Sequence, residues 1–265
     1  MIKEFFGFGG YSRSAEGFLS WQHLTFVTCL MVVMVALAIL LGNKMRTEEE
    51  SKKNKVIVVS AIMIDSFELF KIVLLCIRHG DAMHWLHELP LFLCSIQLIV
   101  LPLAAFSKGR IKESALDFVM IFGVLGALLG TYGAGNNYSV YPVLGFDNVV
   151  SGITHAISGF ASLYIMISRM ASMKKKNIPI TLAILTAFCS VAYPVNLILD
   201  YNYMFLMRGD GTPYDIIYNL LNGNPVLYPL SVVLLFFVYM SLFYYVYYII
   251  TRPHIKNTSI LTNVN

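Results

Sequence analysis

The stretch FLSWQHLTFVTCLMVVMVALAILL, residues 18–41, contains no Asp, Glu, Lys or Arg. A helix rises 1.5 Å per residue, so about 20 apolar residues cross the hydrocarbon core of a bilayer. Further apolar runs follow at 56–77, 85–106, 115–132, 149–170, 178–199 and 227–250. Backbone groups inside a bilayer must be hydrogen-bonded within their own segment, which favours helices. We therefore predict an all-α, polytopic membrane helical bundle with seven transmembrane helices, forming a single integral membrane domain over residues 1–265.

The basic residues indicate the orientation of this bundle. They gather in alternate connections, at 42–55, 107–112, 169–177 and in the tail from Thr251, while the other connections hold few. Positively charged connections stay in the cytoplasm, so we predict an N-terminus outside and a cytoplasmic C-terminus. The net charge of +4 comes from clusters beside membrane helices and gives no reason to expect nucleic acid.

Cysteine usage argues against disulfides and metal binding. The four cysteines fall within or at the ends of predicted helices and form no CxxC pair: Cys29, Cys76, Cys94 and Cys189. The chain has neither a P-loop nor an HExxH motif. We expect no metal and no cofactor.

Polar side chains collect in the half of the predicted bundle that faces outside. LHELPLFLCSIQ, residues 86–97, places His87, Glu88 and Cys94 at the head of an otherwise apolar run, and His155 lies at a similar depth in a later helix. His87 and Cys94 are seven residues apart, or two helical turns, so we expect them to share one face. Ionisable groups in a membrane normally face the bundle interior or a water-filled cavity, so we predict a polar pocket open to the outside.

Each of these residues also has a plain structural interpretation. Cys94 is either a small packing residue or a nucleophile, and His155 is either a base or a donor to a backbone carbonyl. Glu68 and Lys71 are most simply an ion pair, which Asp65 could join, and their functional interpretation is a path for protons or ions.

Three further features concern local structure. Pro90 either occupies the first turn of the third helix or kinks a helix that begins earlier. The glycines Gly123, Gly126 and Gly130 indicate close helix packing. Residues 212–223 are typical of a short amphipathic helix, with Pro213 at its first position and its apolar side formed by Ile216, Ile217, Leu220 and Leu221.

Four segments together resemble the YwaF-type bacterial integral membrane proteins over residues 18–250. They are FLSWQHL around His23, HELPLFLCSIQ around Cys94, THAISG around His155, and LDYNYMFLM with Asn202 and Tyr203. That family is grouped with eukaryotic transmembrane acyltransferases that remodel ether phospholipids. The resemblance implies a protein of the bacterial cell membrane in which Cys94 forms an acyl-enzyme thioester and His155 is the base. Phe92 stands where the bacterial pattern often has a histidine.

The leading hypothesis is therefore an acyltransferase or transacylase whose substrate is a membrane phospholipid or lysophospholipid at the outer leaflet. His23, Glu68, His87, Asn202 and Tyr203 are the expected supporting residues, and the last three are candidate donors to the tetrahedral oxyanion. With water as the acceptor, the same residues would form a lipase. The alternatives are a small-solute transporter component and a non-enzymatic membrane-binding protein that uses the same polar pocket.

Overall fold

The computed structural model describes residues 2–171 and 173–261, and the regular structure within these ranges is entirely helical. The chain divides into two compact units, Met1–Ser172 and Met173–Asn265. Five described helical segments are long and apolar enough to cross a membrane: Trp21–Met45, Gly109–Val140, Phe146–Ile167, Lys175–Leu199 and Leu227–Thr251. The predicted class of an all-helical membrane protein is thus confirmed.

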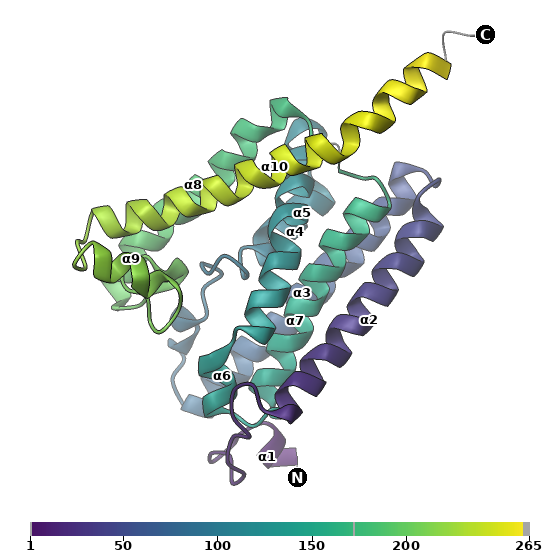
Figure 1. Cartoon of the computed structure of the whole chain (residues 1–265). Coiled ribbons are helices and arrows are strands. Elements are labelled where there is room, and N and C mark those ends of the chain that lie inside the picture. The colour runs from purple at the N-terminus through teal and green to yellow at the C-terminus, as the bar shows by residue number, and fades with distance from the viewer. Residues whose placement is uncertain (1, 172, 262–265) are drawn as a thin grey trace. The chain divides into compact units, whose positions relative to one another are not determined.

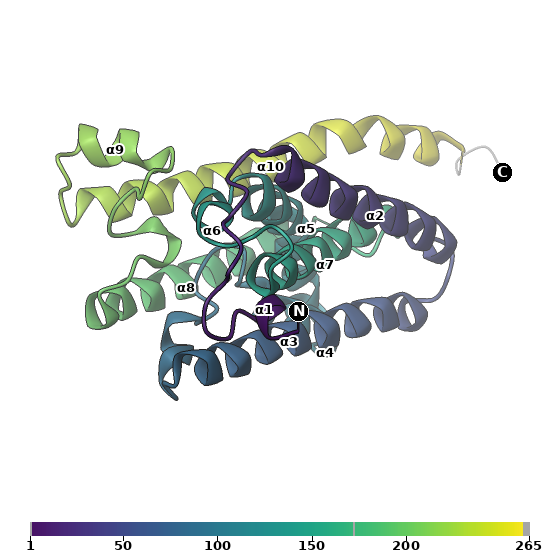
Figure 2. The same cartoon turned by 90° about the horizontal axis from the view of Figure 1, so that it is seen from below.

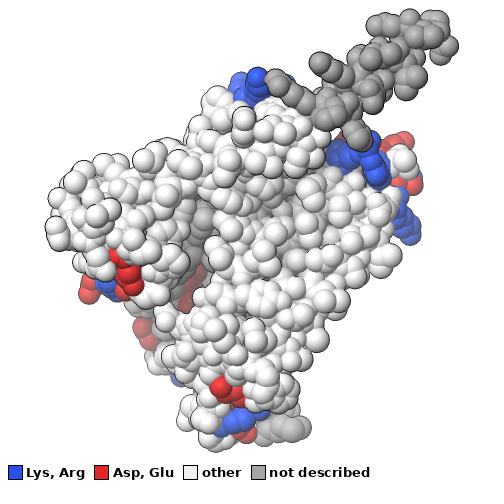
Figure 3. Space-filling view, in the orientation of Figure 1, with Lys and Arg blue, Asp and Glu red and all other residues white. Residues whose placement is uncertain are grey.

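The first unit is a bundle of long helices. Its elements are α1 (Ile2–Phe5), α2 (Trp21–Met45), α3 (Glu50–His79), the 3₁₀ helix η1 (His84–His87), α4 (Gln97–Phe106), α5 (Gly109–Tyr132), α6 (Gly135–Val140) and α7 (Phe146–Ile167). Helix α7 packs against α5, α2 and α3 (Figures 1 and 2). On the face shown in Figure 3, charged side chains gather at the end near the N-terminus and at the opposite end, and the surface between them is mostly uncharged.

Close packing of α5 on α7 depends on Gly123. A β-carbon at this position would stand 2.7 Å from the backbone oxygen of Ser158 and from the β-carbon of Ser162. The Ser162 hydroxyl also donates to the backbone oxygen of Met120 at 2.7 Å. The prediction that these glycines serve close helix packing is confirmed at this crossing.

One end of the first unit, which we call the N-terminal end, is closed by residues 2–20. Arg78 at the end of α3 makes a bidentate ion pair with Asp147 at the start of α7. Nη2 donates to Oδ1 at 2.7 Å, and Nη1 donates to Oδ2 at 2.8 Å. The Tyr11 hydroxyl donates to the same carboxylate at 2.6 Å, and Arg78 also donates to the backbone oxygen of Phe6. Burial, together with the Asp147 carboxylate, raises the pKa of Tyr11, so its hydroxyl remains a donor.

The prediction of one continuous helix over 85–106 is wrong. An α-helix forms only from Gln97, and the preceding residues form η1 followed by bends and turns. Pro90 disfavours helix in the residue before it, and the Ser95 hydroxyl both accepts from the backbone N–H of Phe92 and donates to its oxygen, at 3.0 and 3.1 Å. His87 and Cys94 therefore do not share a helical face, and Pro90 is in no helical first turn.

The second unit contains η2 (Lys175–Asn177), α8 (Ile178–Leu199), η3 (Tyr203–Phe205), α9 (Tyr214–Leu220) and α10 (Leu227–Leu261). Helix α9 is the amphipathic helix predicted within 212–223, and Pro213 directly precedes it. Its predicted apolar side is divided: Ile216 and Leu220 are exposed, whereas Ile217 and Leu221 are half-buried.

Candidate functional site

The histidine of the candidate site, His155, has one ring nitrogen hydrogen-bonded to the backbone and the other without a hydrogen-bond partner among the described residues. Nδ1 of His155 lies 2.7 Å from the backbone oxygen of Ser151, one turn earlier in α7. A carbonyl only accepts, so Nδ1 carries the hydrogen and Nε2 is the basic nitrogen. Nε2 is inaccessible to solvent and has no hydrogen-bond partner among the described residues.

Cys94 lies near this ring nitrogen. Its thiol and the His155 ring are close enough for a side-chain interaction, although no hydrogen bond within ordinary geometric limits forms between them. Cys94 is half-buried, and no disulfide engages it. The structure thus brings together the two residues that the sequence analysis proposed as nucleophile and base.

Helix α5 provides the surface on which the pair rests. A β-carbon on Gly130 would stand 2.0 Å from Nε2 of His155, and one on Gly126 would stand 3.3 Å from the β-carbon of Cys94. These glycines are one helical turn apart, so the same face of α5 receives both side chains. The spacing predicted to serve helix packing therefore also makes room for the Cys94–His155 pair.

An ion-pair cluster on α3 holds the segment that leads to Cys94. Lys71 bonds to Glu68 at 2.6 Å, which confirms the predicted pair, and also to Glu88 at 3.0 Å. Each of these side chains is largely shielded from solvent. Asp65 does not join the cluster through its Oδ1, which is buried and has no partner among the described residues. Lys71 therefore fixes Glu88, six residues before Cys94, to α3.

Two of the predicted supporting residues of the first unit have other surroundings. His23 is fully buried: Nε2 contacts the backbone oxygen of Thr131 at 3.1 Å, and Nδ1 accepts from the backbone N–H of Leu19 at 3.1 Å. One ring nitrogen of His23 thus connects α2 to Thr131 of α5, and the other holds the residues that lead into α2. His87 is exposed in η1, with its ring 5.7 Å from that of His84, and the ring of His84 stacks on that of His79 at 4.1 Å.

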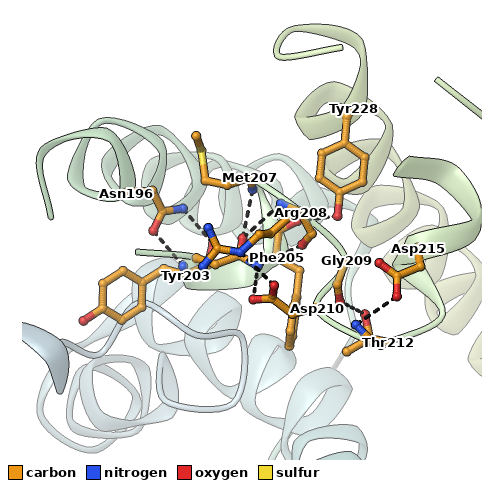
Figure 4. A network of polar contacts seen from close by, with 12 residues as sticks. Asn196, Tyr203, Phe205, Met207, Arg208, Gly209, Asp210, Thr212, Asp215 and Tyr228 are labelled. Atoms are coloured by element: carbon orange, nitrogen blue, oxygen red, sulfur yellow. Dashed lines mark hydrogen bonds and ion pairs between the residues drawn. The ribbon is translucent and has the colours of Figure 1, made fainter. Parts of the chain in front are cut away.

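Asn202 and Tyr203 organise a loop of the second unit (Figure 4). The amide nitrogen of Asn202 donates to the backbone oxygen of Arg208 and to the carboxylate of Asp210, and its oxygen accepts from the backbone N–H groups of Met207 and Arg208. Asn196 bonds to the backbone of Tyr203 in both directions, at 2.6 and 3.0 Å. Both donor hydrogens of Asn202 are thus engaged within its own loop.

Two residues of the quoted segment 86–97 were not among the predicted site residues. Glu88 could have been singled out as an acid at the head of an apolar run, but its partner Lys71 lies on another element. Gln97, the first residue of α4, is completely buried, and neither of its amide atoms has a hydrogen-bond partner among the described residues. The sequence signal for Gln97 was an amide three residues after the candidate nucleophile.

A bundle of apolar helices around a shielded cysteine–histidine pair defines the class as a polytopic helical membrane protein with a candidate nucleophilic site. The TMEM164 family model matches residues 18–253, and the chain belongs to the TMEM164 family. No curated protein and no solved structure matches the chain.

Proposed function

We propose that this protein transfers acyl groups between lipids through a thioester on Cys94. The observation that carries the proposal is the buried Nε2 of His155, which has no hydrogen-bond partner among the described residues and lies beside the Cys94 thiol, while Nδ1 is held by the backbone oxygen of Ser151. A desolvated thiol is inert unless a basic partner stands close, and this ring nitrogen is such a partner.

The reaction follows from these atoms. Nε2 takes the thiol proton, and the Cys94 sulfur forms a bond to the carbonyl carbon of a phospholipid ester while the carbonyl electron pair moves to oxygen. When the tetrahedral intermediate collapses, the C–O bond to glycerol breaks and the departing alkoxide takes the proton from Nε2. A lysophospholipid hydroxyl then repeats the sequence in reverse, giving its proton to Nε2 and accepting the acyl group.

The same proposal includes the arrangement in the membrane. We infer seven membrane-crossing segments, with α3 and residues 85–106 added to the five long apolar helices. The N-terminal end then faces outside a bacterial cell membrane, as the distribution of basic residues favours. The resemblance to YwaF-type proteins and to ether-phospholipid acyltransferases supports the lipid substrate.

The test is intact-protein mass spectrometry after incubation with mixed phospholipids. The wild type should gain the mass of an acyl group, hydroxylamine should remove it, and Cys94→Ala and His155→Ala should not form it. Cys29→Ala, which changes an exposed cysteine of α2, is the matched control and should acylate like the wild type. An unmodified wild type that still retains bound lipid would contradict the proposal.

A transporter component is the second candidate, favoured by the charged side chains of α3. Lys71 is already bonded to two carboxylates, which favours a fixed bridge over a mobile carrier. Transport predicts solute flux in vesicles that is lost in Glu68→Gln and retained in Cys94→Ser. Acyl transfer predicts the opposite dependence on Cys94.

A further inference from the structure

Gln97 has a buried amide that the fold itself does not use. Its side chain is completely shielded, yet neither Oε1 nor Nε2 meets a hydrogen-bond partner among the described residues. An unsatisfied buried polar group destabilises the folded state, and natural structures contain few of them. Such a group is explained when a ligand or reaction intermediate provides the missing partner.

The chain places Gln97 one turn from the nucleophile. The backbone N–H of Gln97 bonds to the backbone oxygen of Cys94 at 3.4 Å, and α4 begins at Gln97. Helix α4 packs against α5, whose Gly126 contacts Cys94. The segment from Cys94 to Gln97 thus carries a thiol and, three residues later, a buried amide with no partner among the described residues, both next to α5.

Helix α7 has a matching arrangement. Ser158 lies one turn beyond His155, its hydroxyl is buried, and it too has no partner among the described residues. Gly123 of α5 contacts the backbone of Ser158, and it lies one turn from Gly126 in the direction away from the N-terminal end. Ser158 follows His155 by one helical turn, and the backbone N–H of Gln97 bonds back to Cys94, so Gln97 and Ser158 each lie one turn beyond a member of the pair.

We propose that the Gln97 side-chain amide is the oxyanion donor of the site, with Ser158 at the matching position one turn beyond His155. This inference rests on the proposed acyl transfer. When the Cys94 sulfur adds to the ester carbonyl, the oxygen becomes negatively charged, and the Nε2–H group of Gln97 donates to it. A donor already placed in a shielded site stabilises the intermediate without reorganisation, and loss of one such donor slows a reaction about 10²–10³-fold.

The inference replaces two of the earlier candidates, His87 and Asn202, on physical grounds. His87 is exposed, and both donor hydrogens of Asn202 are engaged in its own loop. Gln97 instead has two N–H groups with no partner within the described part of the chain.

The decisive variant is Gln97→Met, which keeps the volume and removes the donor. Two rates are compared for the purified protein: acylation of Cys94 by phospholipid, followed by mass spectrometry, and alkylation of Cys94 by iodoacetamide. Alkylation forms no oxyanion, so it reports the thiol and His155 alone. We expect acylation to fall about 100-fold or more, alkylation to stay within twofold, and the melting temperature to stay equal or rise.

Controls separate a donor from a structural residue. Gln22→Met changes the other glutamine of the chain, which is partly exposed in α2, and should leave both rates unchanged. Gln97→Asn keeps an amide on a shorter side chain and should recover part of the acylation rate. If Gln97→Met does not fold, Gln97→Asn still tests the donor. Its alkylation rate shows whether Cys94 is intact, and its acylation rate shows the effect of moving the amide.

Several results would overturn the inference. Acylation of Gln97→Met within threefold of the wild type would show that the amide is not the donor, and a parallel fall of acylation and alkylation would show that Gln97 only positions Cys94. A wild type that forms no acyl adduct would refute the proposed function itself, before any Gln97 variant is considered.

Discussion

The imidazole of His155 lies directly on Gly130: a β-carbon there would stand 2.0 Å from Nε2 and 2.1 Å from Cδ2. No rotation of a methyl group relieves such an overlap, so the ring and its bond to Ser151 must move. Gly130 therefore determines where the base of the candidate site lies, although it carries no side chain of its own.

We expect Gly130→Ala to displace His155 and to destabilise the protein by about 1–3 kcal/mol, the usual cost of overpacking. Labelling of Cys94 by iodoacetamide should slow at least tenfold, because Nε2 no longer faces the thiol. Gly126→Ala, whose β-carbon would be 3.3 Å from that of Cys94, should have a smaller effect. Equal labelling rates in all three proteins would disprove this dependence on Gly130.

The link between Lys71 and Glu88 gives a second prediction. Glu88→Gln removes one of the two carboxylates on Lys71 and loosens the segment that leads to Cys94, while Glu68 continues to neutralise the lysine. We expect a loss of about 1–3 kcal/mol, the range for a lost hydrogen bond to a charged group, and slower Cys94 labelling. Lys52→Ala, which removes an exposed pair with Glu48, should leave the melting temperature unchanged within experimental error.

The Arg78–Asp147 pair predicts how residues 2–20 are attached. The side chains of Arg78 and Asp147 are only 9% and 11% exposed. Removing one partner of a buried ion pair costs about 3–5 kcal/mol. Asp147→Ala should therefore lower the melting temperature and expose residues 2–20 to limited proteolysis. Arg13→Ala affects a half-exposed pair with Glu16 and should leave the protease pattern unchanged. Protection of this segment in Asp147→Ala would contradict the role of the pair.

The stacked histidines at the N-terminal end predict a dependence on pH. Burial lowers the pKa of His84 below its usual 6.5, and nearby His79 and His87 lower it while Asp81 and Glu88 oppose them. The folded state thus binds this proton less readily than the unfolded chain. Stability should be complete above about pH 6.5 and decrease as the pH falls through the lowered pKa. His84→Gln should flatten this part of the melting profile, and an unchanged profile would refute the assignment.

The loop around Asn202 gives a fifth prediction. Asn202→Ala removes contacts to Arg208, Asp210 and Met207, so we expect a destabilisation of about 2–4 kcal/mol from several lost hydrogen bonds. Asn219→Ala changes an exposed position of α9 and is the control, whose melting temperature should stay near that of the wild type. Differential scanning calorimetry in detergent measures both variants. A melting temperature for Asn202→Ala equal to that of the control would contradict the structural role.

Long apolar runs allowed most helices to be predicted closely, since α2 and α7 follow hydrophobicity and length alone. The segment 88–96 could not be predicted, because its turns depend on the Ser95 hydroxyl and on the attachment of Glu88 to α3. Cys94 and His155 were proposed together because of a resemblance and a shared depth, and the structure places them near each other. Gln97 was missed because a sequence does not show whether a buried amide has a hydrogen-bond partner. In the described part of the structure the amide of Gln97 has none.

The closure of the N-terminal end also determines the order of biosynthesis. Tyr11 is 136 residues from Asp147 along the chain, and Arg78 is 69 residues from it. A ribosome must therefore deliver most of the first unit before residues 2–20 can acquire their carboxylate partner. Residues 2–20 leave the ribosome well before α7 and must wait for it to reach their native contacts, and a nascent chain that stops before α7 exposes an Arg78 without its Asp147 carboxylate to quality control.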